Sequence, residues 1–121
     1  MTDEDLLAEL IHSSPSFAAD WRSTEEYYPL ADPQTIPDAL FQVVPHIYRL
    51  LVKDRHHELG TLLAAVERIY EAGTPTQREH VKYCVLDTVA RDCRALGLDP
   101  ELVVVHLGPA CKTVWTGLDV R

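Results

Sequence analysis

The chain has 121 residues, of which 46% are hydrophobic and 25% are charged, and its formal net charge is -8. This length and composition suit one globular domain and argue against a disordered or fibrous chain. No apolar run approaches the roughly 20 residues that a membrane-spanning helix needs, and the acidic start at residues 1–5 is unlike a basic secretion signal. We therefore expect a cytoplasmic protein without a membrane partner.

The cysteines point to a reducing compartment. Three are present, Cys84, Cys93 and Cys111, so they cannot all pair within the chain. Cys84 and Cys93 fall in an apolar helical stripe, where a free cysteine packs as a small hydrophobic residue.

The excess negative charge lies entirely in the N-terminal third. Residues 1–41 contain nine acidic residues and one basic residue, whereas the remaining eighty contain ten of each. This asymmetry argues against binding to nucleic acid or to an anionic membrane. It favours either solubility alone or attraction to a basic partner.

The first elements are two short helices. Residues 3–12 place leucines on one face and carboxylates at the start, where they suit the positive end of the helix. Ser14 and Pro15 then provide a cap and a first residue for a second helix. Phe17 and Trp21 lie four residues apart on it, a spacing that favours docking onto the core over ligand binding.

Residues 22–37 lose helical periodicity and contain two prolines before Ile36. We expect an ordered loop or an extended segment. Tyrosines beside glutamates on such a loop form a contact surface, because tyrosine supplies a large amphipathic area and a fixed loop loses little entropy on binding. A loop that merely covers the core is the alternative. The predicted partner-binding residues are Asp20, Glu25, Glu26, Tyr27, Tyr28 and Asp32.

Helical periodicity returns after Pro37 and continues to Leu51, with Pro45 inside it. Proline either kinks a helix or begins a new one. We expect the first helix to end near Val44 and a new helix to begin at Pro45, and a kinked helix is the alternative. A polar link follows at residues 53–56.

The central feature is a helical hairpin over residues 57–96. Its first helix has an apolar stripe from Leu59 to Tyr70, and we expect its charged residues to face solvent, Glu67 and Glu71 as a solvated pair. Residues 74–77, Thr-Pro-Thr-Gln, form a capping box that begins the second helix. Gly73 before it is expected to adopt a positive φ. The charged residues expected to face solvent are Glu58, Glu67, Arg68 and Glu71, and the stripe of the second helix is Val81, Val85, Val89, Cys93 and Leu96.

Gly97 ends the hairpin, and residues 99–101, Asp-Pro-Glu, signal a further helix start. Three consecutive valines follow and are compatible with a strand, but the start signals favour a buried helix up to Leu107. A last helix follows the interruption at Gly108 and Pro109. We predict an all-α single domain over residues 1–121, a bundle or short stack of antiparallel helices, with an acidic arm at 1–41 and a helical core at 42–121.

Motifs for catalysis or for cofactors are lacking in the sequence, and we expect no catalytic residue, metal or cofactor. His80 and Cys84 lie four apart on one helix, but no CxxC or HExxH pattern accompanies them. Cys84 has apolar neighbours that predict burial, which disfavours a nucleophile. A small metal or thiol enzyme that uses this pair remains an alternative. Asp87 and Asp92 are expected to form surface ion pairs.

Residues 79–87, followed later by Leu107-Gly108-Pro109 and Trp115, resemble a family of small, acidic, all-helical immunity proteins of bacterial polymorphic toxin systems. The resemblance covers about residues 40–118. It implies a non-enzymatic cytoplasmic protein that binds a cognate toxin domain and covers its active site. An acidic surface suits this role, because complementary charge speeds the capture of a basic domain. The alternative is a helical scaffold or a homodimeric domain that associates through the apolar residues 102–107.

Overall fold

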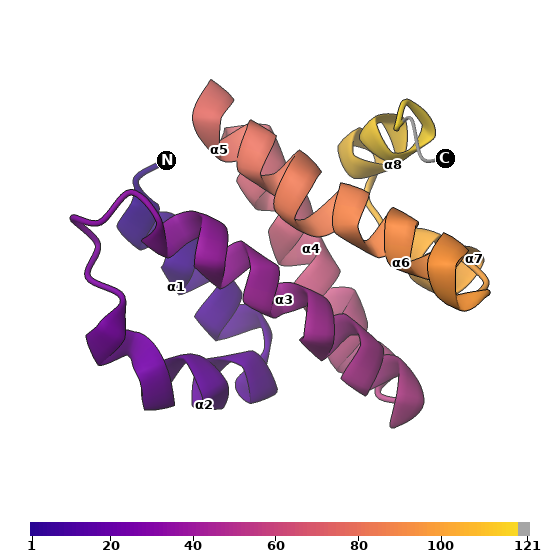
Figure 1. Cartoon of the computed structure of the whole chain (residues 1–121), viewed down its shortest axis with the longest axis horizontal. Helices are drawn as coiled ribbons and strands as arrows, with labels where there is room; N and C mark the ends of the chain where they lie inside the picture. The colour runs from indigo at the N-terminus through magenta and orange to yellow at the C-terminus, as the bar shows by residue number, and fades with distance from the viewer. Residues whose placement is uncertain (119–121) are drawn as a thin grey trace.

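The structure is a computed structural model that describes residues 1–118, and within this range it is helical and strand-free, packed as one domain. The prediction of an all-α domain is confirmed. Figure 1 shows the path of the chain. The helices are α1 (Asp3–Ser13), α2 (Pro15–Thr24), α3 (Thr35–Val52), α4 (His56–Ala72), α5 (Pro75–His80), α6 (Thr88–Leu96), α7 (Glu101–Val104) and α8 (Pro109–Thr116), with a 3-10 turn η1 (Glu25–Tyr27) and a π-helical segment η2 (Val81–Asp87).

Helix α4 lies at the centre of the domain. It packs against α1, α3, α5 and α8, and its predicted apolar stripe is buried up to Ile69, while Tyr70 is only partly buried. In Figure 1, α3 crosses in front of α4, with α1 and α2 on one side and α6, α7 and α8 on the other. The buried stripe consists of Leu59, Leu62, Leu63, Val66 and Ile69.

Helix α3 runs through Pro45 without ending, so the predicted new helix at this residue is wrong. Proline removes the hydrogen bond to the carbonyl four residues earlier, which belongs to Phe41. Pro45 and Phe41 are both exposed, so this carbonyl lies on the solvent side, where water can bind it. The opposite side buries Val43 and Ile47, and this packing keeps the helix continuous.

The second helix of the predicted hairpin is one continuous rod composed of α5, η2 and α6 (Figure 1). From Val81 to Cys93 its predicted stripe repeats every four residues, a spacing that drifts around an ordinary α-helix with 3.6 residues per turn. The π-helical segment has wider turns, with bonds from i to i+5. It therefore helps Val81, Val85 and Val89 to stay on the buried side, while Leu96 in the last turn is exposed.

The turn between the two helices confirms the capping box and corrects the role of glycine. Thr74 accepts a hydrogen bond from the amide of Gln77, and the Gln77 side chain accepts one from the amide of Thr74. Gly73 has a φ of -74°, not the expected positive value. A Cβ there would lie 2.5 Å from the carbonyl oxygen of Ile69, so glycine provides space rather than conformational freedom.

The end of the chain is less buried than predicted. Gly97 ends α6 in the left-handed conformation with a φ of 67°, as expected. Helix α7 has only four residues, and it buries Val103 while Leu102 and Val105 are exposed. The prediction of a buried helix here is therefore wrong for its outer side. Within residues 1–118, no helix combines the length and the apolar character needed to cross a bilayer.

Candidate partner-binding surface

The predicted contact loop is built from the end of α2, the turn η1 and the segment up to α3. Hydrogen bonds within the loop hold its shape. The amide of Tyr28 donates to the carbonyl of Glu25 over 3.0 Å, and the hydroxyl of Thr35 donates to the carbonyl of Pro29 over 2.7 Å. The Asp32 carboxylate accepts from the amide of Gln34 over 2.9 Å. The predicted loop is shorter than expected: α2 and η1 extend through residues 22–27 and α3 begins at Thr35, so only residues 28–34 lie outside the helices.

A column of aromatic rings anchors this loop to the core. Tyr28 stacks on Trp21 with ring centroids 5.3 Å apart, and Trp21 stacks on Phe17 at 6.2 Å. Trp21 and Phe17 are buried, as predicted. Tyr28 is half-buried because it covers Trp21, so it is less available to a partner than its predicted contact role requires. It serves as the anchor of the loop.

The remaining predicted contact residues of the loop face solvent. Glu25, Glu26 and Asp32 are exposed, and the side chain of Tyr27 is 73% exposed. In the described part of the chain, neither Glu25 nor Glu26 has a side-chain hydrogen bond or an ion pair. We call Glu25, Glu26, Tyr27 and Asp32 the acidic loop; it lies at the edge of the molecule beside α2 (Figure 1).

Asp20 is arranged differently from the acidic loop. Its carboxylate lies 3.0 Å from Nε2 of His46 and 3.2 Å from Nη1 of Arg49, both on α3. Its charge is thus already used to hold α2 against α3. Of the six predicted contact residues, five are exposed, but Asp20 among them already contacts His46 and Arg49, and Tyr28 packs on Trp21.

A buried polar cluster that the sequence did not indicate lies beneath α2. Nδ1 of His46 lies 3.4 Å from the hydroxyl of Ser16, which donates to the Glu58 carboxylate over 2.6 Å. Ser14, the cap of α2, also donates to Glu58 over 2.7 Å. The prediction that Glu58 faces solvent is therefore wrong. Ser14 and Ser16 lie more than forty residues from Glu58 in the sequence, and only the fold brings them together.

The surroundings shift the pKa values of both ionisable groups in this cluster. Burial is the largest influence on His46 and lowers its pKa, against the opposing effect of Asp20. Burial alone would raise the pKa of Glu58, but hydrogen bonds from Ser14 and Ser16 and the nearby Arg55 lower it overall. Both shifts favour a neutral imidazole beside an ionised carboxylate.

Asp20, His46 and Ser16 follow one another as carboxylate, imidazole and hydroxyl, the same sequence of groups as in a catalytic triad with a serine nucleophile. The geometry fits a structural link better, because the Ser16 hydroxyl donates to Glu58 and the His46 ring is only 2% exposed. In nucleophilic catalysis the hydroxyl must instead donate to the imidazole. The cluster connects α2, α3 and α4 through hydrogen bonds that a buried polar group needs.

The other predicted chemical groups are distributed over the fold. Cys84 is buried as predicted, and this burial raises the pKa of its thiol. Across residues 1–118, no group of three or more potential metal ligands surrounds a common point. Asp87 pairs with Arg91 at 2.8 Å, as predicted, whereas Asp92 accepts a hydrogen bond from the hydroxyl of Tyr48 over 2.6 Å.

Glu67 also departs from its prediction. It is buried, and its carboxylate accepts hydrogen bonds from the amides of Ala110 and Cys111 at the start of α8. The expected solvated pair with Glu71 does not form, although Glu71 itself is exposed.

Comparisons of the chain with protein-family models, with curated proteins and with solved structures find no match.

Proposed function

We propose that this chain is a non-enzymatic binding protein of the immunity type, which captures a basic toxin domain through the acidic loop and covers the active site of that domain. One observation carries the proposal. Glu25 and Glu26 are exposed and unpaired within the described residues, on a loop that the stacking of Tyr28 on Trp21 holds in place.

The charge of the loop supports a basic partner. Unpaired carboxylates on one surface attract a positive surface and accelerate its capture, particularly at low ionic strength. Asp20 on α2 is already paired with His46 and Arg49. Near α2, the carboxylates of the acidic loop are therefore the ones that remain available to a partner.

The rigidity of the loop supports a stable complex. A flexible loop loses conformational entropy when it binds, whereas a loop already fixed by hydrogen bonds and ring stacking loses little. Tyr27 projects from this fixed loop and is largely exposed. Tyrosine is enriched at binding interfaces because its ring supplies apolar area and its hydroxyl a hydrogen bond.

The proposal predicts that a neighbouring gene encodes a polymorphic toxin, and binding of the C-terminal domain of that toxin, measured by isothermal titration calorimetry, tests it. We expect the double variant Glu25→Lys/Glu26→Lys to weaken binding at least about tenfold, because two attractive contacts become repulsive. We also expect binding by the unmodified chain to weaken as salt is raised.

The matched control is Glu71→Lys/Glu79→Lys. Both glutamates are exposed and lie on α4 and α5, and the net charge changes equally. The control should bind as the unmodified chain does. Equal effects of the two double variants would show that total charge, not the acidic loop, governs capture, and an unchanged affinity of the loop variant would refute the proposal.

A further inference from the structure

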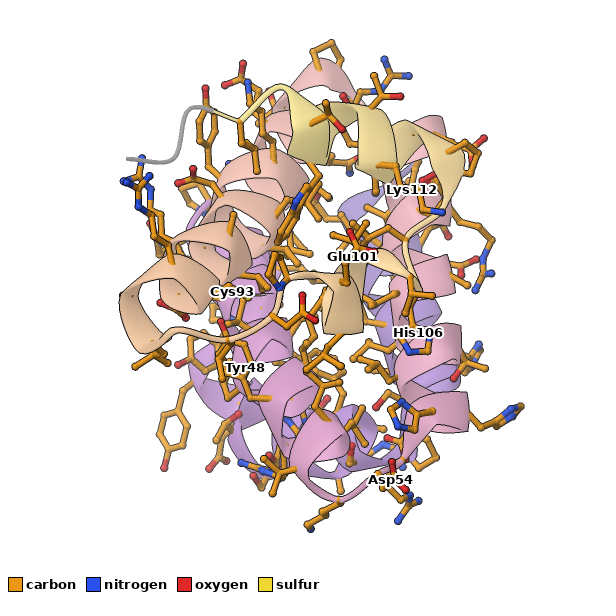
Figure 2. All side chains as sticks on the ribbon, turned by 90° about the vertical axis from the view of Figure 1, so that its right-hand side faces the viewer. Tyr48, Asp54, Cys93, Glu101, His106 and Lys112 are labelled. Carbon is orange, nitrogen blue, oxygen red and sulfur yellow. The ribbon has the colours of Figure 1, made fainter. Side chains whose placement is uncertain are left out.

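A second surface of the molecule is apolar and exposed. It lies where the end of α3, the end of α6 and the short helix α7 meet, and we call it the α7 face. In Figure 2, α7 lies in front, with labelled Cys93 and Tyr48 to one side of it and Glu101 on it. The exposed apolar residues of the α7 face are Val52, Leu96, Leu98, Leu102 and Val105, with exposed fractions from 41% to 87%.

The shape of the α7 face suits contact with the same face of a second copy of the chain. A hollow of about 230 Å³ lies between α3 and α7, and another of about 250 Å³ lies between α6 and the end of α8. Leu98 and Cys93 line both hollows, so Leu98 forms a ridge between them. A surface with a ridge beside a hollow can interlock with its own copy about a two-fold axis, as isologous interfaces require.

The charges around the α7 face are also complementary to themselves. Lys53 follows Val52 at the end of α3, and Asp99 lines the first hollow; both are exposed. A two-fold arrangement can therefore place the lysine of one copy beside the aspartate of the other. The exposed charges beside the α7 face also include Glu101 on α7 (Figure 2) and Arg94, which lines the second hollow, so acidic and basic groups are both present here.

The position of the α7 face favours a second copy over the basic partner of the acidic loop. Figure 1 shows α6 and α7 at one end of the longest axis and the loop after α2 at the other. Two copies joined through the α7 face would keep their negatively charged thirds far apart and leave both acidic loops open.

We propose that two copies of this chain associate through the α7 face. The exposed apolar area of its five large residues is on the order of 500 Å² per copy, near the upper end of what monomers leave uncovered. With the walls of the hollows and the polar rim, it approaches the ~800 Å² that each partner contributes to a stable interface. This proposal is independent of the function of the acidic loop.

Sedimentation velocity of the purified chain between about 1 and 100 µM tests the proposal. We expect a species of twice the 13.7 kDa chain mass that dissociates on dilution. Leu102→Glu should raise the dissociation constant at least about tenfold, since it places a charge in an apolar contact. Phe41→Glu is the matched control, because Phe41 is 47% exposed and Leu102 is 48% exposed.

Circular dichroism checks that each variant folds. If Leu102→Glu does not fold, Val52→Glu replaces it in the test, because Val52 is the most exposed residue of the α7 face. The loop variant Glu25→Lys/Glu26→Lys should remain dimeric, which separates this proposal from the function of the loop. A chain that sediments at 13.7 kDa throughout, or equal effects of Phe41→Glu and Leu102→Glu, overturns the proposal. The proposal is also overturned if the chain is monomeric and Leu102→Glu abolishes binding of the toxin domain, because the α7 face then binds the toxin domain and not a second copy.

Discussion

Glu67 on α4 caps helix α8: its carboxylate accepts a hydrogen bond from the backbone amide of Cys111 over 2.8 Å and another from the neighbouring Ala110 over 3.0 Å. The first amides of a helix have no partner within the helix, and a carboxylate satisfies them well. The contact is buried, so water cannot easily replace it.

We predict that Glu67→Ala lowers the free energy of unfolding by about 2 kcal/mol, because it leaves buried amides without an acceptor. Urea denaturation measures this change. Glu71→Ala is the matched control one turn later, where the side chain is exposed, and it should change stability by less than about 0.5 kcal/mol. Similar losses for both variants would contradict the role of the cap.

Gly108 lies against the same carboxylate. A Cβ at this position would come within 2.5 Å of the Glu67 side chain. We expect Gly108→Ala to destabilise the chain by about 1–3 kcal/mol, because Glu67 must move away from the amides of α8. Gly60→Ala is the control, since its Cβ would meet only His106 at 3.6 Å within a helix, where alanine stabilises by up to about 1 kcal/mol. Thermal unfolding of both variants distinguishes these outcomes.

The two adjacent tyrosines should separate folding from binding. Tyr28→Ala removes the ring that stacks on Trp21, and we predict a loss of about 1–2 kcal/mol of stability together with weaker toxin binding. Tyr27→Ala removes a largely exposed ring and should weaken binding while stability changes by less than about 0.5 kcal/mol. Urea denaturation gives the stability of each variant, and isothermal titration calorimetry gives its affinity for the toxin domain. A Tyr27 variant as unstable as the Tyr28 variant would contradict the exposed position of Tyr27.

Stability should decrease as the pH is lowered from 7 to 5. The pKa of His46 in the fold lies below its usual value of 6.5, mainly because of burial, and burial also lowers the pKa of His106. The unfolded chain then binds protons at a higher pH than the folded chain, so unfolding becomes easier below about pH 6.5, by at most about 1.4 kcal/mol per pH unit for each histidine.

Urea denaturation at several pH values between 7 and 5 measures this slope. His46→Gln should reduce the slope relative to that of the unmodified chain, because it removes a histidine whose pKa burial lowers in the fold. The pKa of Glu58 lies below its usual 4.5, so its stabilising effect persists above that pH and is lost only as the pH falls below 4.5, outside the range of the experiment. An unchanged slope in His46→Gln would contradict the assigned pKa.

The local features of the fold could be predicted from the sequence alone. The spacing of Leu59, Leu62 and Ile69 indicated the buried side of α4, and the capping box at 74–77 indicated where α5 begins. Gly97 indicated the end of α6. Each of these signals acts within one or two helical turns, so its physical cause lies within the same short segment.

The positions of the charged and aromatic groups required the tertiary structure. Glu58 and Glu67 look like ordinary solvent-facing residues of a helix, but hydroxyls from α2 and amides from α8 make their burial favourable. Whether Tyr28 contacts a partner or the core likewise depends on Trp21, seven residues earlier and on another element. The sequence by itself determined the all-helical class, most helix positions apart from the predicted break at Pro45, and the concentration of negative charge in the first third. Only the packing of these helices decided which carboxylates remain available to a partner, because a carboxylate is buried only where groups distant in the sequence supply its hydrogen bonds.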